Sequence, residues 1–121
     1  MKKILIVDDE PNIVMALEYT FKKNNFEVFI ARDGQEALDI LENHLPDLII
    51  LDVMMPNVDG YNTIEQIKKD NRLVSTKVIF LSAKNKEKDI EKGLALGADL
   101  YMTKPFSVKK LVEQVNELTK A

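Results

Sequence analysis

Short apolar segments alternate along the chain with longer segments whose apolar residues recur at helical spacing. The apolar segments cover residues 4–7, 28–30, 48–51, 78–81 and 100–102, and most are apolar at every position. Strands that are apolar at every position are typical of a parallel sheet covered on both faces. The sequence therefore predicts five buried β-strands.

Each apolar segment is followed by a stretch with the periodicity of a helix. The apolar positions of these stretches are Val14, Leu17 and Phe21; Ala37, Leu38 and Leu41; Ile64 and Ile67; Ile90 and Leu94; and Val108, Leu111, Val112, Val115 and Leu118. Pro11 is favoured in a first helical turn, and Asp33 and Glu36 have the spacing of a capping box. Gly97 suits a helix end and Ser107 a helix start. Five β-α units with right-handed crossovers predict a doubly wound α/β fold.

Length and composition narrow the class of protein. A chain of 121 residues fits one domain over 1–121, and 45% hydrophobic with 31% charged residues is a globular composition. A net charge of −3 without a basic run argues against nucleic-acid binding. With no cysteine, disulfides, Cys-ligated zinc and thiol catalysis are excluded. No apolar run reaches the length of a membrane span and no cleavable signal is visible, so we expect a cytoplasmic protein without membrane contact.

Polar residues that could form a site follow four of the predicted strands: Asp8 and Asp9, Asp52, Ser82, and Lys104. Ligands of open parallel sheets bind at the carboxyl ends of the strands. If the first and third strands are neighbours, Asp8, Asp9 and Asp52 meet in one crevice. Carboxylates at close range repel one another, and a bound divalent cation offsets this repulsion. Because the candidate ligands are oxygen atoms, with no Cys or nearby His, Mg²⁺ is favoured over zinc or copper.

The same residues favour phosphoryl chemistry, because Mg²⁺ commonly shares its ligand shell with a substrate phosphate. Lys104 would contact phosphoryl oxygens as a point charge, and Ser82 would donate a hydrogen bond. A carboxylate beside the metal can itself accept the phosphoryl group. The sequence does not decide which carboxylate accepts, but Asp52 is the better candidate because Asp8 and Asp9 then remain for the metal. Taken singly, each residue has a structural explanation as a cap, turn residue or surface charge, and their joint placement favours a site.

Four motifs resemble the response-regulator receiver domain of two-component signalling. They are Asp-Asp-Glu-Pro at 8–11, Leu-Asp-Val-Met-Met-Pro at 51–56 with Asp-Gly at 59–60, Leu-Ser-Ala at 81–83 and Lys-Pro-Phe at 104–106. The motifs occur in order, at the usual spacing, and span essentially the whole chain. The resemblance implies the flavodoxin-like strand order 2-1-3-4-5.

The resemblance also implies a phosphoprotein. Asp52 would be the phosphorylation site, and a histidine kinase or phosphotransfer protein would donate the phosphoryl group. Asp9, Asp52 and the Met54 backbone carbonyl would hold Mg²⁺, for which Mn²⁺ could substitute, while Asp8 would act mainly through water. Lys104 would contact the phosphoryl group, and the peptide bond from Lys104 to Pro105 is expected to be cis.

By the same resemblance, Ser82 and Tyr101 would move on phosphorylation, although a plain core aromatic is an alternative for Tyr101. The face of the fourth helix, fifth strand and fifth helix would then bind an unidentified downstream protein. Leu100 stands where receivers that dimerise through this face commonly carry an acid, and Gln114 adds no charge, so we expect a monomer or a weak dimer. We expect no enzyme activity beyond self-phosphorylation from small donors and self-dephosphorylation.

Three other functions are alternatives to a phosphorylated receiver. A phosphatase of the haloacid-dehalogenase type would use Asp8 as nucleophile and Glu10 as acid, but the chain is short for a substrate cap. A flavodoxin-like electron carrier would need Gly, Ser or Thr amides around a phosphate in the first loop, where this chain has three acids. A degenerate receiver would lack a key residue, and none is missing.

Overall fold

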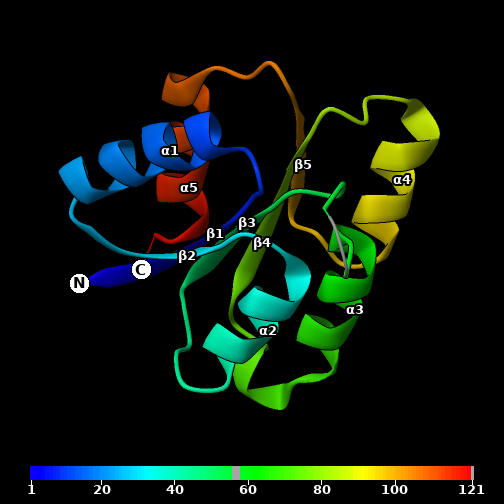
Figure 1. The fold of residues 1–121 in the computed structure, drawn as a ribbon, viewed down its shortest axis with the longest axis horizontal. Helices are drawn as coiled ribbons and strands as arrows, with labels where there is room; N and C mark the ends of the chain where they lie inside the picture. Colours follow the sequence, from blue (N-terminus) through cyan, green and yellow to red (C-terminus); the bar gives the residue numbers. More distant parts are fainter. Residues whose placement is uncertain (56–57, 121) are drawn as a thin grey trace.

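Five parallel strands form the central sheet in the order β2-β1-β3-β4-β5, in a computed structural model that describes residues 1–55 and 58–120 (Figure 1). The strands are β1 (Lys2–Val7), β2 (Phe26–Ala31), β3 (Leu48–Leu51), β4 (Lys77–Ser82) and β5 (Leu100–Thr103). The helices are α1 (Pro11–Lys23), α2 (Gly34–Leu41), α3 (Gly60–Lys69), α4 (Glu87–Ala95) and α5 (Val108–Leu118), with a short 3-10 helix at Asn71–Leu73. The predicted α/β class and strand order are confirmed.

Successive residues of the inner strands enter two separate hydrophobic layers, one on each face of the sheet. Leu5 and Val7 of β1 belong to the layer that includes α2 and α3, whereas Ile4 and Ile6 belong to the layer of α1 and α5. In Figure 1, α1 and α5 accordingly lie on the opposite side of the sheet from α2 and α3. Because side chains alternate along a strand, a strand covered on both faces is apolar throughout, which explains the continuous apolar segments.

The helix ends follow local sequence signals. Asp33 Oδ1 accepts a hydrogen bond from the Glu36 N–H at 2.9 Å at the start of α2, and Glu36 Oε1 accepts from the Arg32 N–H at 3.1 Å. Ser107 caps α5 through its side chain. Gly97 follows α4 with φ of +112°, a conformation that favours glycine. Of the helices described, none has both the length and the apolar character needed to cross a membrane.

Gly60, the first residue of α3, lies directly against the backbone that follows β3. A Cβ atom at this position would overlap the Asp52 carbonyl oxygen and lie 2.7 Å from the Val53 Cα. The Gly60 N–H also donates to the Val53 carbonyl at 2.9 Å. Glycine is therefore required here, and the start of α3 holds the backbone around Asp52 in place.

Candidate functional site

The residues after β1, β3 and β5 continue the hydrogen bonding of the sheet by one position, which brings them to a common edge. The Asp8 N–H donates to the last carbonyl of β2 at 3.1 Å, and the Asp52 N–H donates to the last carbonyl of β1 at 3.0 Å. The Lys104 N–H donates to the last carbonyl of β4 at 2.8 Å, and the Lys104–Pro105 peptide bond that follows is cis. Backbone pairing thus fixes three predicted site residues at the carboxyl edge of the sheet.

The Lys104 ammonium group lies among three carboxylates. Its Nζ donates to Asp8 Oδ2 at 2.9 Å, to Glu10 Oε1 at 2.9 Å and to Asp52 Oδ2 at 3.3 Å. The side chains of Lys104, Asp8 and Asp52 are 9%, 3% and 5% exposed, whereas that of Glu10 is 56% exposed. An ammonium group has three protons, so each one has an acceptor. The cluster combines one buried cation, two buried acids and one acid that stays in contact with solvent.

Burial and hydrogen bonding shift the pKa values in this cluster. Burial raises the pKa of Asp8 above its ordinary value, against the effect of hydrogen bonds from the Glu10 N–H and from Lys104. Burial lowers the pKa of Lys104, but the hydrogen bonds to Asp8 and Glu10 and the charge of Asp52 outweigh it, so the net pKa is raised. Lys104 is therefore cationic at neutral pH, and the ionised form of Asp8 is held at an electrostatic cost.

Asp52, the predicted acceptor, has its two carboxylate oxygens bound by different groups. Oδ1 accepts from the Met54 N–H at 3.2 Å, and Oδ2 accepts from Lys104. The Met54 side chain itself is exposed. Two donors on opposite oxygens fix the orientation of the carboxylate at the edge of the sheet.

The oxygen atoms of the cluster fit a divalent cation. One carboxylate oxygen from each of Asp8, Glu10 and Asp52 lies within 4.8 Å of the other two. Oxygen donors suit a hard cation such as Mg²⁺. The sequence predicts Asp9 as the third carboxylate of this group, but in the structure the third carboxylate is that of Glu10. Asp9 is exposed and lines an adjacent cavity. Ligation by Asp9 stays a prediction, as does ligation by the Met54 carbonyl.

The two predicted switch residues both bind the backbone of Lys84. Ser82 is fully buried at the end of β4, and its Oγ accepts from the Lys84 N–H at 3.2 Å. The Tyr101 hydroxyl donates to the Lys84 carbonyl at 2.7 Å, and its half-buried ring lies 5.7 Å from the Phe80 ring between centroids. Lys84 therefore connects the end of β4 to the side chain on β5, a link that the sequence did not predict.

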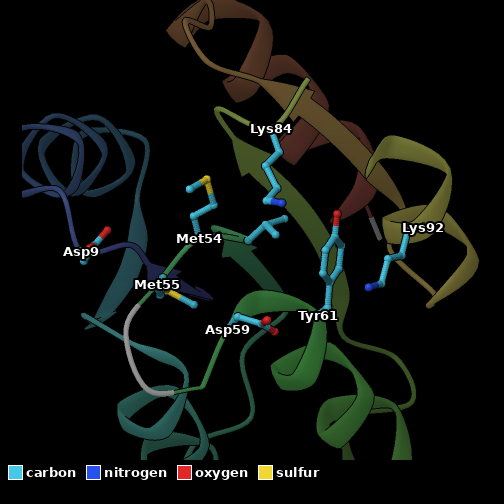
Figure 2. Close-up of a pocket in the computed structure, with 8 residues that line it drawn as sticks. Asp9, Met54, Met55, Asp59, Tyr61, Lys84 and Lys92 are labelled. Carbon is cyan, nitrogen blue, oxygen red and sulfur yellow. The ribbon is translucent and has the colours of Figure 1, made fainter. Parts of the chain in front are cut away.

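A cavity of about 500 Å³ lies beside the cluster, between the segment after β3 and α4 (Figure 2). Its lining residues are Asp9, Val53, Met54, Met55, Asp59, Tyr61, Lys84 and Lys92. The Tyr61 hydroxyl donates to the Asp89 carbonyl at 3.1 Å, and Lys92 Nζ lies 4.4 Å from the Tyr61 ring centroid. Tyr61 was not predicted as a site residue, because an aromatic residue in a first helical turn has the same pattern when it only packs in the core.

The fold and the site define a class of protein. A 2-1-3-4-5 parallel sheet carries acids after β1 and β3 and a lysine after β5, and residues 4–116 match the family model of the response regulator receiver domain. The chain belongs to this family, so the resemblance drawn from the motifs is confirmed. Receiver domains with an acidic pocket typically bind a divalent metal, in agreement with the carboxylate cluster.

Individual relatives agree with this assignment. The chain is 44% identical over 117 residues to the alkaline phosphatase synthesis transcriptional regulatory protein PhoP of Bacillus subtilis (strain 168), covering 97% of this chain and 48% of that protein. It thus spans about half the length of this relative. The receiver domain of Francisella response regulator 1452 superposes with a TM-score of 0.92 at 36% identity, covering 99% of this chain and 98% of that one. The BeF3-activated DrrB receiver domain superposes with a TM-score of 0.91 at 30% identity, covering 100% and 99%.

Proposed function

We propose that this chain is a signalling switch that accepts a phosphoryl group on Asp52 from a histidine kinase or a phosphotransfer protein. The observation that carries the proposal is the pairing of Asp52 with Lys104, in which a buried acid has a buried ammonium group 3.3 Å from one oxygen. A carboxylate can act as phosphoryl acceptor where nearby positive charge offsets the charge of the incoming group. The cytoplasmic location expected from the sequence stays a prediction.

In the proposed reaction, a carboxylate oxygen of Asp52 attacks the phosphorus, and the bond from phosphorus to the donor's imidazole nitrogen breaks. The imidazole leaves with the bonding electrons and takes up a proton, and Asp52 becomes an aspartyl phosphate. Lys104 donates to a phosphoryl oxygen, while the Met54 N–H orients the carboxylate before the attack. Asp8, Asp9, Asp52 and the Met54 carbonyl would hold Mg²⁺, or Mn²⁺ in its place. Either ion supplies, when bound, positive charge that offsets the phosphoryl oxygens.

The acceptor assignment is tested by intact-protein mass spectrometry after incubation with Mg²⁺ and acetyl phosphate. The wild type should gain the mass of one phosphoryl group, and should not do so in excess chelator. Asp52→Asn should remain unlabelled, whereas Asp39→Asn, the same change at an exposed acid on α2, should label like the wild type. Full labelling of the Asp52→Asn protein would contradict the assignment. Beyond this chemistry and slow loss of the phosphoryl group, we expect no enzyme activity.

The proposed switch runs through Lys84. A phosphoryl group adds negative charge and acceptor oxygens, which favours a Ser82 hydroxyl that donates toward it. Ser82 would then give up its bond from the Lys84 N–H, and the Lys84 carbonyl that holds Tyr101 would be free to shift. Structures with and without beryllofluoride, a mimic of the phosphoryl group, should differ in the rotamers of Ser82 and Tyr101. Identical rotamers would argue against this route.

The output surface is proposed to be the face formed by α4, β5 and α5, which borders the switch. An unidentified downstream protein would bind there. Leu100 and Gln114 supply no charge for a symmetric dimer through this face. Light scattering with and without beryllofluoride should therefore show a monomer or a weak dimer, and a tight activated dimer through this face would contradict the proposal.

A further inference from the structure

Glu10 contacts the cluster in a way that phosphoryl transfer to Asp52 does not require. It is the N-cap residue of α1, just before Pro11, yet its side chain makes no capping hydrogen bond. Its Oε1 accepts instead from Lys104 Nζ at 2.9 Å, which is as short as the bond to Asp8 and shorter than the 3.3 Å bond to Asp52. The Glu10 side chain therefore contacts the lysine and not the helix end, which points to a role at Lys104.

We propose that Glu10 is a positioning residue that binds Lys104 in the resting protein and releases it when a phosphoryl group is attached to Asp52. This inference rests on the function proposed above. All three protons of the ammonium group already have acceptors, so Lys104 can donate to a phosphoryl oxygen only after one of the three bonds opens.

The exposures of the three acids decide which bond opens. Asp8 is 3% exposed, so it would remain as a buried charge without its cation if Lys104 left it. Glu10 is 56% exposed, so its carboxylate can exchange the hydrogen bond from Lys104 for hydrogen bonds from water at a small cost in free energy. Lys104 stays beside Asp52, because the phosphoryl group that it is to contact is attached there, so the choice lies between Asp8 and Glu10. The Lys104–Glu10 bond is therefore the one that exchanges for a bond to the phosphoryl group.

The test is the affinity for beryllofluoride at saturating Mg²⁺, followed by NMR. Glu10→Gln keeps the shape of the side chain and removes its charge, so Lys104 is held less firmly in the resting state. The dissociation constant should fall about two- to fivefold, the size expected for an ion pair with one exposed partner. Glu65→Gln, the same charge change at an exposed position on α3, should leave it unchanged.

A second measurement does not depend on the phosphoryl mimic. In the metal-free protein, the Lys104 ammonium protons should exchange with solvent faster in Glu10→Gln, and faster still in Glu10→Ala, than in the wild type, as followed by ¹⁵N NMR. A side chain with a merely structural role would change the free energy of unfolding without this graded change in exchange. A separate Mg²⁺ titration shows whether the metal affinity changes.

The outcomes separate the two proposals. Unchanged or weaker beryllofluoride binding in Glu10→Gln, beside normal binding by the wild type, would overturn the role of Glu10 alone. A loss of Mg²⁺ affinity of about tenfold or more, the scale seen on removal of groups that support a metal site, would identify Glu10 as part of the metal site and would also overturn it. A wild type that binds no beryllofluoride would refute the phosphorylation switch itself.

Discussion

Replacing Lys104 by methionine should destabilise the fold by an amount that depends on pH. Methionine keeps much of the length of the side chain and removes its charge. Asp8 and Asp52, which are 3% and 5% exposed, then lose the cation that lies 2.9 and 3.3 Å away. Breaking a buried ion pair by removal of one partner costs about 3–5 kcal/mol.

Protonation of one carboxylate limits this cost. For an aspartate with a pKa of about 3.9 in the unfolded chain, protonation costs about 4 kcal/mol at pH 7 and about 1.5 kcal/mol at pH 5. Asp8 is the residue expected to take the proton, because burial already raises its pKa. The folded variant then binds a proton that the unfolded chain does not, so its stability relative to the wild type rises as the pH falls. We expect a loss of about 3–4 kcal/mol at pH 7 and about 1–2 kcal/mol at pH 5.

Urea denaturation followed by circular dichroism at both pH values, without Mg²⁺, measures this difference. Lys109→Met, at an exposed position on α5, is the matched control and should change the free energy of unfolding little. Excess Mg²⁺ should recover part of the loss at pH 7, because a bound cation replaces the missing charge. An equal loss at pH 5 and pH 7, or no loss, would refute the reasoning.

Three other predictions test separate parts of the site. Tyr101→Phe removes the 2.7 Å hydrogen bond to the Lys84 carbonyl and should lower the free energy of unfolding by about 1 kcal/mol in urea titrations. Because burial raises the pKa of Tyr101 from 10.0 to about 12, the wild type should also lose stability as the pH rises through this interval, and the phenylalanine variant should lack that loss. Asp9→Ala should weaken Mg²⁺ binding in NMR titrations more than Asp8→Ala does, and equal effects would contradict direct ligation by Asp9. Met54→Asn should speed loss of the phosphoryl group, because an amide can orient an attacking water and a thioether cannot; an equal or slower release of phosphate would count against this interpretation.

The sheet and the edge that carries the site could be predicted from the sequence for one physical reason. Strands buried on both faces leave no room for polar side chains within their length, so polar residues concentrate where the strands end. Asp8, Asp52 and Lys104 follow directly after β1, β3 and β5, and parallel strands bring their carboxyl ends to one edge. The start of α5 could also be predicted from a local signal, because Ser107 is expected to cap the helix and its Oγ accepts from the Lys110 N–H.

The arrangement of the side chains within the site could not be predicted in the same way. Asp8, Asp9 and Glu10 are three consecutive acids, and no pattern in the sequence distinguishes the one that turns toward Lys104 from the one that faces solvent. The backbone path from β1 into α1 decides this, and it buries Asp8, exposes Asp9 and returns Glu10 to the lysine. The contacts of Lys84 with residues on two strands likewise depend on tertiary packing.

The division of the interior into two layers affects how sequences of this kind can diverge. Leu17 and Leu111 fill the layer of α1 and α5, while Ile64 and Phe80 fill the layer on the other face of the sheet. The strand backbones separate the two layers, so a change of side-chain volume in one layer is compensated first by neighbours in the same layer. Substitutions in different layers should then have additive effects on the free energy of unfolding. The layer beneath α1 and α5 can therefore accumulate substitutions while the packing of Phe80 against Tyr101 stays unchanged.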